Sequence, residues 1–154
     1  MKAPEGTRFP RPSDRGLPFI PKGVLRGRIE WSEFLDYHEP PTGHFTLLVT
    51  HGEWVSAAAC VEVRRDDLVV DYLARNDLFR PATFVPAGTV LLSAIEANAE
   101  ALGLGAIRLD CVPDVATRRW YESNGFVTEG PARDEPGWGP LTPMVRRVGP
   151  GAGP

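Results

Sequence analysis

The sequence predicts a mixed α/β (α+β) fold, with a mostly antiparallel central sheet of about six strands and one parallel crossover. Three β-prone runs, at 45–50, 54–63 and 68–74, are separated by short polar turns, which is typical of an antiparallel meander. The pattern then changes to a helical period over 88–102, with apolar residues on one face. Another β-prone run at 107–112 follows, and a strand–helix–strand unit of this kind places its two strands parallel.

The remaining elements follow from period, capping and stop signals. A short amphipathic helix is predicted over 29–39, because its apolar residues recur at helical spacing before two prolines. Another helix begins after Asp114, a good N-cap residue, and ends at Gly125. Strands are predicted from Phe126 onward and over 141–148.

Length and composition predict how the chain is organised. A chain of 154 residues has the size of one domain. Residues 1–26 are rich in Pro and Gly and lack an apolar period, so we expect an irregular arm. Residues 27–148 are expected to form a single domain, followed by a flexible tail at 149–154.

Composition and charge argue against several classes of protein. No window approaches the roughly 20 apolar residues of a membrane span, and no signal peptide is visible, so we expect a cytoplasmic protein without membrane contact. The formal net charge of −3 gives no basic footprint for nucleic acid. Cys60 and Cys111 lie in apolar runs without metal or redox spacing, so we expect buried free thiols and no metal site.

The segment 107–126 carries the most specific pattern. A predicted strand is followed by Asp114, by Thr117 and by the run Trp-Tyr-Glu-Ser-Asn-Gly-Phe at 120–126. This order resembles the strand–helix signature of the Gcn5-related N-acetyltransferase (GNAT) superfamily, with Asp114 for the usual Asn and Thr117 for the usual Ala. The resemblance covers roughly 45–148 and implies a GNAT-like acyltransferase domain in which the two parallel central strands splay apart.

The resemblance also implies acetyl-CoA as co-substrate and no metal. In this family the pantetheine arm enters the gap between the splayed strands, and the diphosphate binds at the start of the crossover helix, where free N–H groups and the helix dipole favour an anion. The residues expected to contact acetyl-CoA come from the end of one strand, the following loop, the start of the crossover helix and the last helix. They are Leu73, Ala74, Arg75, Arg80, Val85, Gly88, Thr89, Asp114 and Tyr121.

Acyl transfer to an amine requires a neutral amine, a polarised carbonyl and a stabilised leaving thiolate. By resemblance, Tyr121 is the proton donor near the CoA sulfur and a backbone N–H near Leu73 polarises the carbonyl; a purely packed tyrosine is the alternative. Asp71 and Asp110, in the middle of the two central strands, are candidates for the general base, and Glu62 is a third. For each carboxylate, the alternative is an ordinary surface side chain.

The loop before the crossover helix departs from the family pattern. Thr83 and Pro86 stand where the family has Arg or Gln and a first Gly, and Gly88 alone matches. Proline has no N–H and fixes φ at about −65°, so Pro86 cannot donate a hydrogen bond to a phosphate. It can still be the first residue of the helix. Arg80 is a candidate to replace the missing cation, with a solvated surface arginine as the alternative.

The leading hypothesis is therefore an N-acyltransferase, most simply an N-acetyltransferase, acting on a small-molecule amine or a protein amino group by direct attack in a ternary complex. A second hypothesis, motivated by Pro86, is a non-catalytic acyl-CoA-binding or protein-interaction module. An aminoacyl-tRNA acetyltransferase is a third, which the negative charge disfavours. A monomer and a homodimer are both compatible with the sequence.

Overall fold

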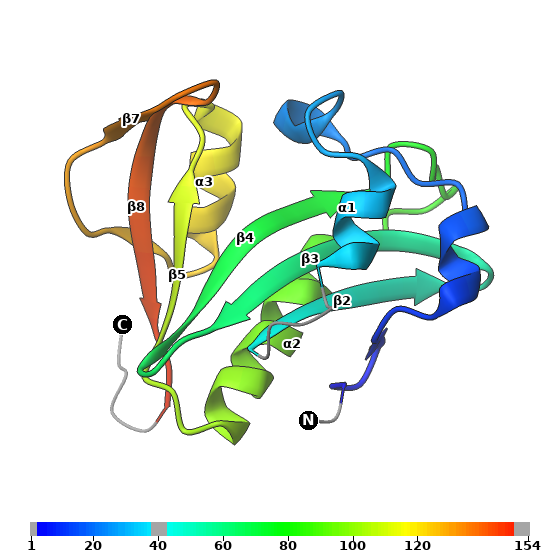
Figure 1. Cartoon of the computed structure of the whole chain (residues 1–154), viewed down its shortest axis with the longest axis horizontal. Helices are drawn as coiled ribbons and strands as arrows, with labels where there is room; N and C mark the ends of the chain where they lie inside the picture. The colour runs from blue at the N-terminus through cyan, green and yellow to red at the C-terminus, as the bar shows by residue number, and fades with distance from the viewer. Residues whose placement is uncertain (1–2, 38–42, 150–154) are drawn as a thin grey trace.

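A single mixed sheet forms the centre of the computed structural model, which describes residues 3–37 and 43–149 (Figure 1). Its strand order is β1-β2-β3-β4-β5-β8-β6, and β7 pairs with β8. The strands are β1 Thr7–Arg8, β2 His44–His51, β3 Trp54–Val63, β4 Asp67–Arg75, β5 Ala106–Cys111, β6 Val127–Thr128, β7 Arg133–Glu135 and β8 Gly139–Arg147. The predicted fold class is confirmed. The sheet has two strands that the sequence did not predict, β1 and β7, because both are too short and polar to show a strand pattern.

Strands β2, β3 and β4 form the predicted antiparallel meander. Gly52, with φ +61°, makes the turn between β2 and β3, a conformation that favours glycine. Both faces of β3 are buried: Ala57 and Ala59 belong to one apolar cluster, and Ala58 and Cys60 to the other. This two-sided burial explains why the run reads as continuously apolar rather than alternating.

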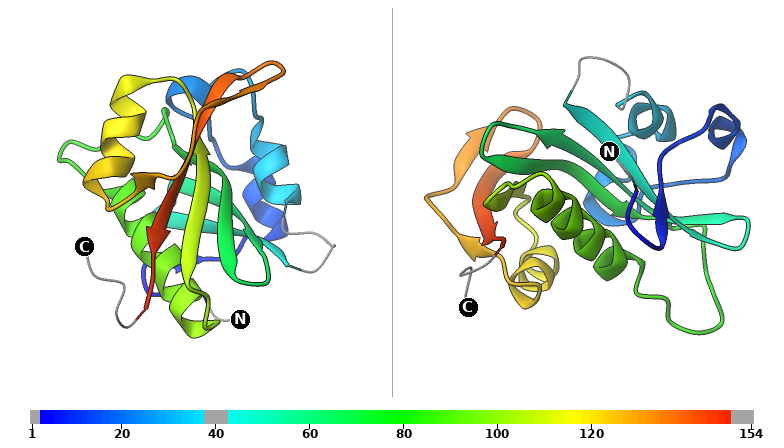
Figure 2. Two further views of the ribbon diagram at one scale, coloured as in Figure 1. Left: turned by 90° about the vertical axis from the view of Figure 1, so that its left-hand side faces the viewer. Right: turned by 90° about the horizontal axis from the view of Figure 1, so that it is seen from below.

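Helices cover the sheet on both faces, as the left view of Figure 2 shows. On one face lie α2 (Ala87–Ala101) and α3 (Val115–Ser123); on the other lies α1 (Trp31–Asp36). Helix α2 joins β4 to β5 as the predicted parallel crossover and ends where Gly103, with φ +70°, stops it. Its buried face includes Leu91, Leu92 and Ile95.

Residues 3–26, expected to be an irregular arm, contain β1 and two 3-10 turns, η1 (Pro12–Gly16) and η2 (Gly23–Leu25). The first part of the arm, with Ala3 and Phe9, packs against the apolar cluster that includes α2. Its later part packs on the sheet face that carries α1, where the rings of Phe19 and Trp31 stack with centroids 4.3 Å apart. Asn76, 3% exposed, fastens it to the end of β4: its amide nitrogen donates to the Pro18 carbonyl at 2.9 Å, and its side-chain oxygen accepts from the Ile20 amide at 3.1 Å.

The other segments predicted from the sequence can be compared with the structure where it describes them. Helix α1 is shorter than the predicted 29–39, of which residues 38 and 39 lie outside the described part of the chain. Of the tail predicted at 149–154, residues 150–154 likewise lie outside it. Cys60 and Cys111 are buried and free, as predicted. No helix in the described ranges is long and apolar enough to cross a membrane.

Candidate active site

The central feature of the site is a gap in the sheet between β4 and β5. The parallel pairing of the two strands runs from Asp67 with Ala106 to Val70 with Leu109 and stops there. At the same point the register of β4 against β3 shifts, because Cys60 pairs with Tyr72 while Val61 pairs with Val70. Asp71 is therefore a bulge residue, and a bulge bends its strand. The bend carries the end of β4 away from β5, which places the predicted splay at Asp71.

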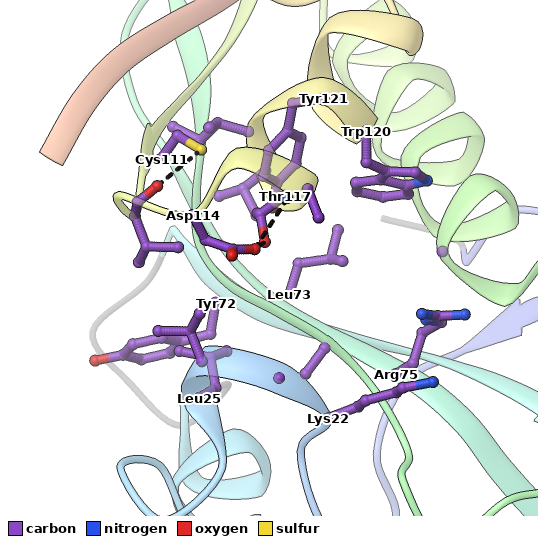
Figure 3. Close-up of a pocket in the computed structure, with 18 of the residues that line it drawn as sticks. Lys22, Leu25, Tyr72, Leu73, Arg75, Cys111, Asp114, Thr117, Trp120 and Tyr121 are labelled. Carbon is purple, nitrogen blue, oxygen red and sulfur yellow. Dashed lines mark hydrogen bonds between the residues drawn. The ribbon is translucent and has the colours of Figure 1, made fainter.

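A cavity of about 580 Å³ fills this gap. Its walls are the end of β4, the start of α2, the end of β5, the first turns of α3 and η2 of the arm. Figure 3 shows Leu73 pointing from β4 toward α3, whereas Tyr72 points to the opposite side, beside Leu25 of the arm. The bent strand thus presents side chains to both sides of the gap.

Nearly all the residues predicted from the sequence to form the site line this cavity. They are Asp71, Leu73, Ala74, Arg75, Val85, Gly88, Thr89, Asp110, Asp114 and Tyr121. Arg80 does not line it. Arg80 borders a smaller hollow of about 220 Å³ and pairs with Asp77 at 3.3 Å, so its charge is partly neutralised within the fold. Glu62, the third candidate base, also lies outside the cavity and pairs with Arg64 at 3.3 Å.

Asp71 has the properties of a general base near neutral pH. Burial of its carboxyl within the gap, with a smaller contribution from the Asp110 charge, raises the pKa of Asp71 to about 6, although part of its surface faces solvent. The Tyr37 hydroxyl donates a hydrogen bond to Oδ2 of Asp71 and holds the carboxyl in place. Tyr37 is itself positioned by edge contacts with the rings of His44 and Tyr72.

Asp110 is less suited to that role. Its carboxylate is exposed and lies 3.6 Å from the guanidinium of Arg133 on β7. The position of Asp110 on β5 brings its charge close enough to affect Asp71. Of the two predicted bases, Asp71 is therefore the one whose surroundings favour proton uptake. The negative charge of Asp110 contributes to the raised pKa of Asp71.

Tyr121 lies on the buried side of α3, with 8% of its surface exposed. Its ring makes edge contacts with Trp120 and Phe126, at centroid distances of 5.0 and 5.5 Å. Burial raises the pKa of Tyr121 well above its usual range, and nearby Cys111 adds to the shift. The hydroxyl therefore keeps its proton at every physiological pH, which is the state a hydrogen-bond donor needs.

Asp114 determines where α3 begins. Its Oδ2 accepts from the Thr117 amide at 3.0 Å and from the Thr117 hydroxyl at 2.5 Å. These two bonds lower the pKa of Asp114, with the hydroxyl bond the larger cause, and keep the carboxylate charged. Asp114 borders the cavity mainly as the N-cap of the helix that carries Tyr121.

The start of α2 differs from the expectation in two ways. Pro86 is the N-cap rather than the first helical residue, and its carbonyl accepts from the Val90 amide at 3.0 Å. Gly88 is buried against α3, because a Cβ at that position would lie only 2.9 Å from the ring of Trp120. Glycine at 88 therefore allows the close approach of two helices, a requirement independent of any ligand.

The comparisons with known proteins agree with this geometry. No family model and no curated protein matches the sequence. Among solved structures, Ard1 from Thermoplasma volcanium superposes with a TM-score of 0.72 at 20% identity, over 94% of this chain and 97% of that one. The ribosomal-protein-S18-alanine N-acetyltransferase from Escherichia coli gives 0.71 at 18% identity, over 92% of each chain. This chain has the GNAT fold.

The fold of the chain is also similar to that of an enzyme solved with a ligand. Aminoglycoside 6'-N-acetyltransferase, in a structure complexed with coenzyme A, superposes with a TM-score of 0.58 at 15% identity, over 71% of this chain and 75% of that one. At such identities the comparisons show the fold alone, so the roles of individual residues in this GNAT-fold chain depend on its own geometry.

Among the residues at the site that the sequence analysis did not single out, Tyr37 and Lys22 bear most on its chemistry. Tyr37 lies within the amphipathic helix predicted over 29–39, where an aromatic residue is typical of a packed face, and its bond to Asp71 joins residues 34 positions apart. Lys22, in the arm of this GNAT-fold chain, lines the cavity because the arm pairs with β4. A lysine among prolines and glycines carries no periodic signal, so sequence patterns alone could not have identified it.

Proposed function

We propose that this protein is an acyl-CoA-dependent N-acyltransferase, most simply an N-acetyltransferase. The observation that carries the proposal is the gap in the sheet at Asp71–Ala74, with a basic carboxyl at its edge and a buried, protonated tyrosine on its wall. A gap between two strands exposes backbone donors and acceptors to a ligand in place of the missing strand. The GNAT fold of the chain agrees with this chemistry.

The cavity fits an acyl-CoA. Its volume of about 580 Å³ lies within the roughly 300–1,000 Å³ usual for small-molecule sites. Apolar residues such as Leu73 and Val85 suit an acyl-pantetheine chain, and Lys22 and Arg75 suit phosphates. When bound, the thioester supplies an activated acyl group, and a carboxyl of this chain, Asp71, accepts the proton of the amine.

The proposed roles follow from the protonation states. Asp71, with a pKa of about 6, is largely ionised at pH 7.5 and takes the proton from the attacking amine, directly or through one water. The new C–N bond forms as the C–S bond breaks, and the Tyr121 hydroxyl keeps its proton and donates a hydrogen bond to the departing thiolate. The thiolate leaves as such or takes a proton from solvent. A backbone N–H near Leu73, in the bent part of β4, polarises the acyl carbonyl.

We propose an acceptor that is either a small-molecule amine or a protein amino group. The similar structures cover both kinds: one is a ribosomal-protein-S18-alanine N-acetyltransferase and another an aminoglycoside 6'-N-acetyltransferase. The acceptor side of the gap is walled by Leu25 and Tyr72, which come from the arm and from β4. Acceptor selectivity in a common fold depends on loop and arm segments of this type, so an assay is needed to distinguish a small-molecule amine from a protein amino group.

The test is release of free thiol from acetyl-CoA in the presence of an amine panel. The panel includes polyamines, aminoglycosides and peptides with free N-termini, and mass spectrometry of the products identifies the acylated nitrogen. We expect turnover with at least one acceptor class, and loss of turnover in Asp71→Asn. The proposal is wrong if no panel member yields thiol and CoA does not raise the melting temperature.

A second candidate function is supported by Pro86, which removes one N–H where the family pattern has glycine. On this alternative the protein binds acyl-CoA without turning it over. A thermal shift with acetyl-CoA, no thiol release over the panel and no effect of Asp71→Asn on CoA affinity would favour binding without catalysis.

A further inference from the structure

The arm extends the sheet at the point where β5 has left β4. Pro21 bridges to Asn76, the Lys22 amide donates to the Arg75 carbonyl at 2.9 Å, and the Asp77 amide donates to the Ile20 carbonyl at 2.8 Å. The buried Asn76 side chain holds this pairing from inside. The backbone of Lys22 is therefore fixed directly opposite that of Arg75.

This pairing places two like charges side by side. Figure 3 shows the Lys22 and Arg75 side chains extending in the same direction from their neighbouring backbones. Directly opposed like charges destabilise a strand pair. Within the described parts of the chain, neither cation has a carboxylate within ion-pair distance, whereas Arg26 and Arg80 nearby both pair with Asp77. Asp77 thus neutralises part of the charge of Arg26 and Arg80, whereas Lys22 and Arg75 lie next to each other without such a partner in the described parts of the chain.

The unneutralised pair lies where two cavities join. Lys22 and Arg75 line both the main cavity of about 580 Å³ and the hollow of about 220 Å³. The same boundary includes Val85 and Ala87, at the start of α2. Any ligand that fills the gap at Asp71 and continues past the end of β4 must pass these two cations.

We propose that Lys22 and Arg75 bind a phosphate group of the acyl-CoA donor, so that the arm forms part of the donor site. This inference rests on the proposed function. It assigns phosphate binding to two cations that lie outside the loop before α2. An ammonium and a guanidinium on neighbouring strands give several charge-assisted donors to one anion, and the anion in turn removes their mutual repulsion. Pro86, which cannot donate an N–H, lies close by in the same wall.

Calorimetric titration with two ligands tests this pair. CoA carries the phosphates, whereas acetyl-pantetheine presents the same pantetheine chain without them. The variants are Lys22→Gln, Arg75→Gln and the double variant, and Arg65→Gln is the matched control. Arg65 is an exposed cation in the β3–β4 turn, away from both cavities.

We expect each single variant to weaken CoA binding about fivefold and the double variant roughly twentyfold, as for exposed charge pairs. Acetyl-pantetheine binding stays unchanged, and Arg65→Gln matches the wild type with both ligands. The melting temperature of each ligand-free variant stays equal or rises, because removing one cation relieves repulsion; a structural role for the pair would lower it.

The two proposals fail in different ways. If the double variant binds CoA within twofold of the wild type, the phosphate role of Lys22 and Arg75 is wrong and the acyltransferase proposal stands. An equal loss for CoA and acetyl-pantetheine also overturns it, because the loss then comes from the shape of the gap. A wild-type protein that binds neither ligand overturns both proposals.

Discussion

At the scale of single residues, the position of Asp71 combines two effects. As the bulge residue of β4 it turns the strand away from β5, and the same turn places its carboxyl at the edge of the gap that it creates. The surroundings that raise the pKa of Asp71 to about 6 are thus a product of the bulge. One irregularity in the sheet provides both the space for a ligand and a group that accepts protons near neutral pH.

Asp71→Asn tests the base. In the wild type, kcat/KM is expected to rise with pH through about 6, because only the ionised carboxyl accepts the proton. The variant keeps an oxygen that accepts from Tyr37 but cannot take up a proton, so kcat falls about 100-fold. An acid limb near pH 6 that persists unchanged in the variant assigns the base elsewhere.

The same substitution has a predicted effect on stability. The folded-state pKa of Asp71 lies above its unfolded value, so the folded protein binds more protons than the unfolded chain between about pH 4 and 6. The contribution of Asp71 to stability is therefore lost as the pH rises through about 6. We expect the melting temperature of Asp71→Asn to exceed that of the wild type at pH 7.5 and to approach it at pH 4.

Tyr121→Phe tests the hydrogen bond to the leaving sulfur. The ring contacts with Trp120 and Phe126 remain, so thermal unfolding should change little, while kcat falls about 100-fold for loss of one hydrogen bond to the developing thiolate. Tyr72→Phe, on the opposite wall of the cavity, is the matched control and should retain kcat within a few-fold. Equal losses in the two variants would mean that neither hydroxyl has a specific role.

At the scale of elements, the contact of α2 with α3 sets the width of the cavity. The two helices approach where Gly88 lies under the ring of Trp120, and both residues line the cavity. Helix α3 carries Tyr121, and α2 begins at the boundary of the two cavities. A change in the spacing of these helices therefore moves the tyrosine relative to the gap.

Gly88→Ala tests that spacing. The added Cβ meets the Trp120 ring at 2.9 Å, and the overpacking should cost about 1–3 kcal/mol of unfolding free energy. Gly105→Ala is the control, because nothing lies within 4 Å of a Cβ there. Adding Trp120→Leu to Gly88→Ala should recover part of the stability lost in Gly88→Ala; additive losses in a denaturant titration would contradict the contact.

Elements with a strong local signal were predictable from the sequence. The capping Asp114 and the stop at Gly125 defined α3, and the apolar period defined α2 within one residue at each end. Strand β7, by contrast, has three exposed charged residues, Arg133–Glu135, and forms only because β8 offers it an edge. Such a strand depends on tertiary pairing, which a local pattern does not contain.

At the scale of the whole molecule, the site is built from both ends of the chain around a sheet covered on two faces. The arm closes one end of the gap, while β5 and α3 form its other side (Figure 1). Nearly all the donor-binding residues that the family resemblance implied line the cavity, because they follow the strands and helices in order. The resemblance did not predict Lys22, or the bond from Tyr37 to Asp71, because both depend on where α1 and the arm dock.

Asn76→Ala tests how the arm is held. The variant loses the bonds to Pro18 and Ile20 and leaves buried backbone groups without partners, which should cost about 2–4 kcal/mol. Limited trypsin digestion should then cleave within residues 8–28 before the rest of the domain. The control is Asn98→Ala: Asn98 is also buried, but its amide nitrogen has no partner within the described chain, so the loss should be much smaller. Equal losses would contradict the role of Asn76.

The fastening of the arm also has a consequence for the order of assembly. Asn76 binds Pro18 and Ile20, which precede it by 58 and 56 residues, so residues 18–20 cannot make these bonds until the end of β4 has been synthesised. Contacts of such sequence separation require closure of a long loop and form late in folding. During synthesis the meander can pair before the arm is captured, and the end of the gap that holds Lys22 closes only afterwards. A ribosome-bound chain from which Asn76 has emerged from the exit tunnel should therefore protect residues 18–22 from protease, whereas a chain in which Asn76 is still inside the tunnel should not.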